Sequence, residues 1–210
     1  MELTPKDRPL RVGILLSGRG SNFLAIARNI REGRLLNVEI AVVLSNVADA
    51  PGIAAAHKLG LATAVHISKG RRRPDHDRDM LATLREHNVD LVCLAGYMRL
   101  LSPDFIHAFP NRILNIHPSL LPAFPGLDAQ QQAFDYGVQF AGCTVHFVDE
   151  HLDHGVIILQ RAIHVLESDD AHSVADRILA EEHQVYSEAI ARVASGHYKI
   201  EGRRYVHRNS

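Results

Sequence analysis

The chain has 210 residues, of which 46% are hydrophobic and 22% are charged, a composition typical of a globular protein with a substantial core. Its formal net charge of −1 excludes the basic surface on which binding to nucleic acids or anionic membranes depends. The apolar runs are far shorter than the roughly 20 residues of a membrane span, and the N-terminus lacks the apolar core of a secretory signal. We therefore expect a cytoplasmic protein without nucleic-acid or membrane partners.

The first half of the chain alternates apolar runs with amphipathic segments. Residues 10–16 form a nearly continuous apolar run, followed by a glycine turn and by apolar residues at helical spacing from 23 to 30. This pattern predicts a strand, a turn and a helix. Strands that are apolar on both faces are typical of a parallel sheet with helices on both sides. The alternation continues, with strands predicted at 38–44, 62–67 and 89–95 and helices at 51–59 and 74–87.

The second half ends in a predicted hairpin and a long helix. Two strands joined by a short polar turn indicate antiparallel pairing. The predicted elements are a short helix from an N-cap at Ser102 to Phe109, a strand at 113–116, a helix at 128–136, strands at 143–148 and 156–165, and a helix at 171–194.

The chain shows no internal repeat and no linker. We therefore expect an N-terminal extension at residues 1–9, one domain over residues 10–196 and a C-terminal tail at residues 197–210. The predicted fold class is α/β: a doubly wound, mostly parallel sheet with helices on both faces and an antiparallel C-terminal hairpin.

Two cysteines, Cys93 and Cys143, are too few for a disulfide framework and lack the spacing of a zinc motif. Neither lies in a sequence that lowers a thiol pKa. We expect both to be buried, reduced thiols rather than nucleophiles.

The glycine turn Ser17-Gly-Arg-Gly-Ser-Asn22 lies between the first strand and a helix N-terminus. Free backbone N–H groups and the helix dipole favour a phosphate there. A dinucleotide is disfavoured, because Phe23 occupies the third glycine position and Asn46 replaces the acid expected after the second strand. We expect a single phosphate bound by Gly20, Ser21 and Asn22; the alternative is a turn without a ligand.

Asn115 and His117 lie two residues apart in a predicted strand, so their side chains share one face. An amide donor beside a titratable ring can stabilise an oxyanion while a proton is moved. The alternative is a strand end with an exposed histidine.

The predicted hairpin concentrates titratable groups between Gly142 and Gly155. Its histidines and aspartates could bind a divalent metal, or one aspartate could reach His117 and hold its proton. We expect no metal, because no pair has the His-Glu-x-x-His spacing and a tight turn scatters its side chains. The groups concerned are Thr144, His146, Asp149, Glu150, His151, Asp153 and His154.

Two further charged features have competing interpretations. Glu182 falls on the apolar stripe of the last helix, so it requires either a ligand hydroxyl or a structural partner such as an arginine. The basic run from Lys69 to Arg73 is either a solvated loop or the source of an anion contact.

The string Asn-Ile-His-Pro-Ser-Leu-Leu-Pro at 115–122, with Leu152-Asp153-x-Gly155, resembles the folate-dependent formyltransferase family. The glycine turn at 17–22, the segment Ala-Gly-Tyr-Met-Arg-Leu-Leu at 95–101 and Glu182-His183 resemble its purine-pathway members. The match runs from Leu10 to Val193. It implies a Rossmann-like formyltransferase fold and transfer of the formyl group of 10-formyltetrahydrofolate to the amine of phosphoribosylglycinamide in purine synthesis, without a metal. The oligomeric state would be a monomer or a homodimer.

The resemblance also implies roles for individual residues. Asn115, His117 and Asp153 would be catalytic. The ribonucleotide would be held by Gly20, Ser21, Asn22 and Glu182. The folate would be held by Arg73, Met98, Arg99, Leu100, Leu101, Asn115 and Asp149. Two departures from the family pattern are His154 in place of a common glycine and Arg19 in place of a smaller polar residue.

Three rival functions remain open. A formyltetrahydrofolate deformylase usually has an N-terminal regulatory domain, for which we expect no room before Leu10. A tRNA formyltransferase requires a C-terminal RNA-binding domain and a basic surface. A non-catalytic nucleotide or folate sensor would have no reason to retain the three catalytic residues.

Overall fold

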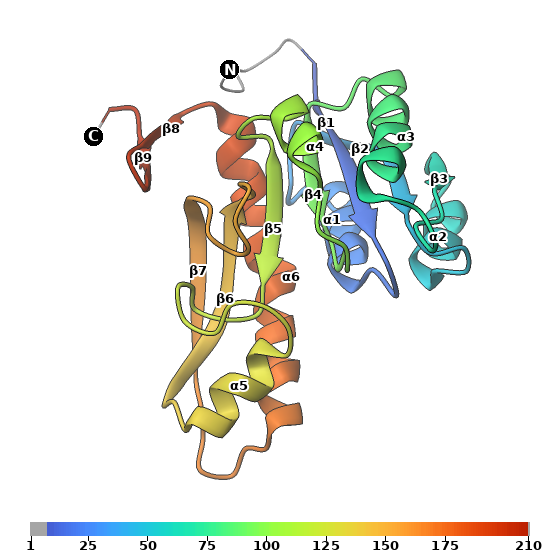
Figure 1. The fold of residues 1–210 in the computed structure, drawn as a ribbon. Helices are drawn as coiled ribbons and strands as arrows, with labels where there is room; N and C mark the ends of the chain where they lie inside the picture. The colour runs from blue at the N-terminus through green and yellow to red at the C-terminus, as the bar shows by residue number, and fades with distance from the viewer. Residues whose placement is uncertain (1–7, 210) are drawn as a thin grey trace.

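The structure, a computed structural model, describes residues 8–209, so positions 1–7 of the predicted extension and Ser210 of the predicted tail lie outside it. The strands within residues 8–209 form one sheet with the order β3-β2-β1-β4-β5-β6-β7-β9-β8 (Figure 1). The first five strands are parallel, and β6 and β7 form an antiparallel hairpin, as predicted. The strands are β1 (Leu10–Leu16), β2 (Val38–Ser45), β3 (Thr63–Val65), β4 (Leu91–Leu94), β5 (Ile113–His117), β6 (Phe140–Phe147), β7 (Ile157–His164), β8 (Tyr198–Glu201) and β9 (Arg204–His207).

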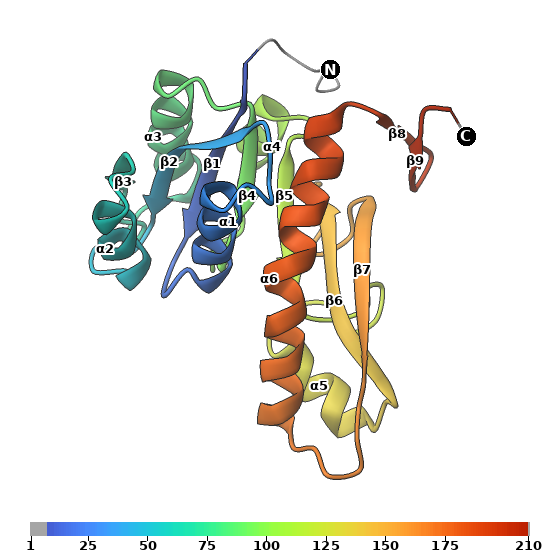
Figure 2. The same cartoon turned by 180° about the vertical axis from the view of Figure 1, so that it is seen from behind.

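Helices cover both faces of this sheet, which confirms the predicted doubly wound arrangement. One face packs against α1 and α6, at the front in Figure 2, and the other against α3 and α4, at the front in Figure 1. A separate apolar core fills each side. The helices are α1 (Ser21–Arg31), α2 (Pro51–Lys58), α3 (Arg73–Glu86), α4 (Pro103–Ala108), α5 (Ala129–Tyr136) and α6 (Ala171–Ser195).

Chain order reverses between β1 and β4. From β1 the chain builds β2 and β3 on one side, whereas β4 and β5 lie on the other. Ligands of open α/β sheets bind at such a switch point, outside the carboxyl ends of the strands. The loops after β1, β4 and β5 therefore begin at one edge of the sheet.

The predicted C-terminal tail contains a hairpin that the sequence analysis missed. Strands β8 and β9 pair with each other, and β9 extends the sheet at the edge of β7. The rings of Tyr198 and Tyr205 stack across the pair, 5.3 Å apart. Strands this short carry too few alternations for a periodic signal.

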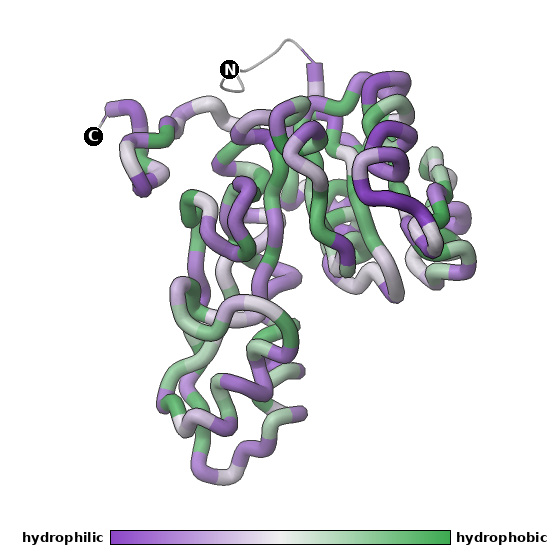
Figure 3. Tube along the Cα trace, in the orientation of Figure 1, coloured by the Kyte–Doolittle hydropathy of each residue, from purple (hydrophilic) through white to green (hydrophobic). Residues whose placement is uncertain are grey.

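The hydropathy of the chain distinguishes one loop and bears on membrane insertion. The segment leading into α3, which contains the basic run, is strongly hydrophilic in Figure 3. Between residues 8 and 209, no helix combines the length and apolar character needed to cross a membrane.

Tyr186 of α6 fastens the helix to the ends of two central strands. Its side chain is fully buried, and its hydroxyl lies 3.0 Å from the carbonyl oxygens of both Leu94 and Leu114. These residues lie at the end of β4 and next to Asn115 in β5, so this contact positions the carboxyl edge of the sheet.

We predict that Tyr186→Phe lowers the free energy of unfolding by about 1 kcal/mol, because one buried hydrogen bond is lost. Urea denaturation monitored by circular dichroism would measure the change. Tyr136→Phe is the matched control, since Tyr136 is 80% exposed. Equal stability of the two variants would contradict the assigned role of Tyr186.

Candidate active site

Strands β5 and β6 bring the polar groups of the site together. Asn115 lies opposite His146, and His117 lies opposite Thr144. The Thr144 hydroxyl donates to the Ser119 carbonyl at 2.7 Å and accepts from the Leu121 N–H at 3.1 Å. Asn115 and His117 thus share one face of β5, as predicted, and the turn that follows them is fastened to β6.

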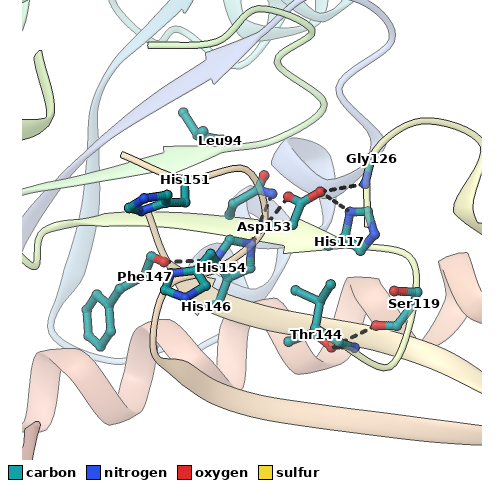
Figure 4. A network of polar contacts seen from close by, with 12 residues as sticks. Leu94, His117, Ser119, Gly126, Thr144, His146, Phe147, His151, Asp153 and His154 are labelled. Atoms are coloured by element: carbon teal, nitrogen blue, oxygen red, sulfur yellow. Dashed lines mark hydrogen bonds and ion pairs between the residues drawn. The ribbon is translucent and has the colours of Figure 1, made fainter. Parts of the chain in front are cut away.

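Asp153 reaches His117 from the loop between β6 and β7 (Figure 4). Its Oδ2 lies 3.4 Å from His117 Nδ1 and accepts the Gly126 N–H at 2.9 Å, while its Oδ1 lies 3.7 Å from His146 Nε2. The Asp153 side chain is only 8% exposed. The structure therefore places a carboxylate beside the imidazole of His117, in line with one of the two interpretations that the sequence left open.

The ring of His117 is hydrogen-bonded at one nitrogen and faces a carboxylate with the other. Nε2 donates to the Phe124 carbonyl at 2.8 Å, and Nδ1 faces Asp153. The 3.4 Å ion-pair contact is longer than a usual hydrogen bond. Nδ1 is therefore not committed to a hydrogen bond with Asp153 and can face a ligand oxygen.

His146 is a site residue to which the sequence analysis gave no role. Burial lowers its pKa, so the ring stays neutral at neutral pH. Its Nδ1–H donates to the Phe147 carbonyl at 2.8 Å, which leaves Nε2 to accept from the Asn115 amide at 3.3 Å. The signal that could have identified it is the cross-strand position opposite Asn115, which requires the register of β6 against β5.

The predicted phosphate turn opens helix α1. Gly20 adopts a left-handed conformation with φ 68°, which glycine tolerates well, and no side chain caps the helix N-terminus. The Asn22 amide donates to Glu182 Oε2 at 2.8 Å, and the buried Asn22 Oδ1 has no hydrogen-bond partner. Glu182 is thus partnered by a residue of the turn, not by an arginine, and burial raises its pKa to about 6.

A hydrogen-bonded chain joins this turn to the loop after β4. The Ser17 hydroxyl donates to Asn46 Oδ1 at 2.6 Å and accepts the Met98 N–H at 2.8 Å. Asn46 Nδ2 donates to the Ser68 hydroxyl at 3.1 Å. Neither Ser17 nor Asn46 was predicted as a site residue, because their partners lie far away in the sequence.

The predicted folate residues differ in what they present to solvent. Met98 and Leu100 are 73% and 54% exposed, whereas Leu101 is buried in the core beside α3 and α4. The Arg99 guanidinium donates to two backbone carbonyls of the loop before α3. Among residues 8–209, Arg73 has no ion-pair partner, which keeps an anion contact open to it.

The expectation that the hairpin turn scatters its side chains is wrong for three of them. Donor atoms of Asp149, His151 and His154 lie within 4.8 Å of one another. Asp153 and His146 instead lie beside His117 and Asn115, respectively.

Both cysteines are free and buried, as predicted. Burial raises the pKa of each thiol, so neither is a nucleophile at neutral pH.

The topology places the protein among the doubly wound α/β proteins, and the contact between Asp153 and His117 equips its carboxyl edge for acid–base chemistry. The chain belongs to the formyl transferase family, whose model matches residues 10–190. The resemblance drawn from the motifs is thereby confirmed.

Relatives cover the described fold almost completely. The phosphoribosylglycinamide formyltransferase of Escherichia coli strain K12 is 37% identical over 91% of this chain and 90% of its own length. The trifunctional purine biosynthetic protein adenosine-3 of Homo sapiens is 42% identical over 91% of this chain, which spans only 19% of that protein. Glycinamide ribonucleotide transformylase 1 of Symbiobacterium toebii superposes with a TM-score of 0.92 at 49% identity, covering 99% of this chain and 98% of that one.

We predict that Glu182→Gln stabilises the protein in a pH-dependent way. The folded-state pKa, about 6, lies above the ordinary value of 4.5, so the stability from the protonated form is complete below pH 4.5 and lost as pH rises through 6. The free energy of unfolding of the variant, relative to that of the wild type, should therefore rise by about 2 kcal/mol as the pH increases from about 4 to about 7. Urea unfolding at both pH values measures this gain.

Glu181→Gln, on the less buried side of the same helix, is the control. A Glu182→Gln gain that does not change with pH would contradict the burial argument.

Proposed function

We propose that this protein transfers the formyl group of 10-formyltetrahydrofolate to the amine of phosphoribosylglycinamide. The products would be formylglycinamide ribonucleotide and tetrahydrofolate, in de novo purine synthesis. The observation that carries the proposal is the buried contact between Asp153 and His117 beside Asn115. The Escherichia coli relative, which this chain matches over 90% of its length, supports the choice of substrates.

The ribonucleotide would bind at the turn that opens α1. Gly20, Ser21 and Asn22 offer backbone N–H groups for the phosphate. Glu182 would accept from the ribose hydroxyls, and the unpartnered Oδ1 of Asn22 would accept from the same ligand. A buried carboxylate and a buried amide oxygen that face a sugar would exchange an unfavourable environment for hydrogen bonds.

The folate would lie along the loop after β4. The exposed apolar side chains of Met98 and Leu100 suit one face of a pterin ring. Arg99 and Leu101 would stabilise this loop, Arg99 through hydrogen bonds to the loop before α3 and Leu101 through burial in the core. Asp149 would close the site from the hairpin, and Arg73 would meet the glutamate carboxylates.

The reaction would proceed by attack of the substrate amine on the formyl carbon. The new C–N bond forms as the carbonyl oxygen becomes an oxyanion, to which Asn115 Nδ2–H and His117 Nδ1–H donate. Asp153 orients the imidazole from 3.4 Å away and, through water, accepts the amine proton. Collapse breaks the bond from the formyl carbon to the folate nitrogen, which takes up a proton.

His146 would act as a positioning residue. Its neutral Nε2 accepts from the Asn115 amide and so orients the amide nitrogen toward the reacting carbonyl. An amide, an imidazole and a carboxylate suffice for this chemistry, so we propose a metal-independent enzyme. We further propose a cytoplasmic monomer or homodimer, with residues 10–196 as its catalytic domain.

We predict that Asn115→Ala and His117→Ala each lower kcat by roughly 100- to 1,000-fold, since each removes one oxyanion donor. Asp153→Asn should lower kcat to a similar degree, because His117 would lose its charge partner. Calorimetry should find ribonucleotide binding largely intact in all three. His172→Ala, a surface change on α6, is the control. Near wild-type turnover in His117→Ala would rule out this mechanism.

The proposed reaction is tested by following folate absorbance with 10-formyltetrahydrofolate and phosphoribosylglycinamide, omitting each in turn. We expect turnover only when both are present, and no loss of activity after exhaustive chelation. Formate release without the ribonucleotide would indicate a deformylase, and binding of both ligands without turnover would indicate a sensor.

A further inference from the structure

Three metal-ligating side chains, those of Asp149, His151 and His154, gather on the loop between β6 and β7, apart from the proposed catalytic residues. Asp149 Oδ2 lies 2.8 Å from His154 Nδ1, and Asp149 Oδ1 lies 3.8 Å from His151 Nδ1. A turn within the loop creates this arrangement, since Asp149 Oδ1 also accepts the His151 N–H at 2.9 Å. Both imidazoles therefore face the same carboxylate.

We propose that Asp149, His151 and His154 bind a divalent cation of the zinc type. Zinc bonds of about 2.0 to 2.2 Å in a tetrahedron place neighbouring ligand atoms roughly 3.3 Å apart. Here one ligand atom from each of the three residues lies within 4.8 Å of the other two, so small side-chain shifts would bring them to that spacing. Two imidazoles select zinc and related transition metals over magnesium and calcium, which prefer oxygen ligands. The side chains are 39% to 77% exposed, so water can take the fourth position.

Charged groups near the loop affect how a cation would bind to it. Asp149 accepts from the His151 backbone N–H at 2.9 Å and lies 2.8 Å from His154 Nδ1, so its carboxyl group faces both histidine residues. Glu150, the neighbouring acid, is paired with His107 at 2.7 Å and lies outside the cluster. The facing cation is Arg203, whose Nη1 lies 3.2 Å from His154 Nε2.

Arg203 and a bound cation compete for His154. Arg203 donates to Nε2, so the ring proton sits on Nδ1 and points at Asp149. Coordination through Nδ1 requires that proton to move to Nε2, which breaks the contact with Arg203 Nη1, although Nη2 still donates to the His154 carbonyl oxygen at 2.5 Å. Metal binding thus costs one of the two Arg203 contacts, and removal of Arg203 favours binding.

The site has a consequence for the enzyme that rests on the proposed function. Asp153 lies between two of the ligands in sequence, so a cation that ties Asp149 to His154 restrains the segment that carries the proposed partner of His117. We expect zinc to slow turnover and a chelator to restore it.

The binding site is tested by calorimetric titration of the full chain with ZnCl2 in excess MgCl2. His151→Gln and His154→Gln keep a polar side chain but remove the imidazole. Each should weaken zinc binding by at least about 10-fold, because loss of a group that only supports a ligand already has an effect of that size. Arg203→Ala should tighten binding. His172→Ala is the matched control, because His172 and Asp176 form an exposed pair, 3.1 Å apart, that belongs to no three-ligand cluster among residues 8–209.

Equal zinc affinity in the wild type and His154→Gln, or no wild-type binding at millimolar ZnCl2, would overturn the site. Zinc inhibition that persists in His154→Gln would overturn its link to turnover. Zinc binding that depends on His154 in a protein without formyl transfer would leave the site standing and remove the proposed function.

Discussion

The buried position of the Asp153 carboxylate is the constraint on which the site depends. An ionised carboxylate in the interior is unfavourable unless hydrogen bonds and opposite charge compensate it. Here the Gly126 N–H and the ring of His117 do so, and they come from a turn that β6 fastens. The loop can close because of Gly155, where a Cβ atom would lie 1.8 Å from the Phe147 carbonyl oxygen. The need for glycine at position 155 thereby helps to determine where the Asp153 carboxylate lies.

The phosphate turn and the loop after β4 are joined by polar contacts between the loops at the carboxyl edge of the sheet, not by the proposed catalytic residues. Asn46 is 7% exposed, and its amide links Ser17, which begins the phosphate turn, to Ser68 in the loop before α3. Through its hydroxyl, Ser17 also holds the backbone of Met98. Displacement of either loop would break hydrogen bonds to buried groups. These hydrogen bonds therefore hold the phosphate turn and the loop after β4 together.

Stability is lower than it could be at the positions proposed to meet ligands. Glu182 is buried against one amide, and the Oδ1 atom of Asn22 has no partner. Groups left unsatisfied in the folded state are available to a ligand without rearrangement, and their unfavourable burial is the usual exchange of stability for function. The exposed cluster around Asp149 differs, because its groups are hydrogen-bonded to one another. A cation bound there would have to replace these contacts.

The sequence by itself determined the order and type of the elements of the central sheet and the shared face of Asn115 and His117. Apolar periodicity and the two-residue repeat of a strand are local properties, so they can be recognised without the fold. Only the tertiary structure decided that Asp153 reaches His117, that His146 lies opposite Asn115, and that Glu182 meets a residue of the phosphate turn. These contacts depend on strand register and on the closure of loops between distant segments. Local patterns carry no information about either, because register and closure follow from the packing of the whole sheet.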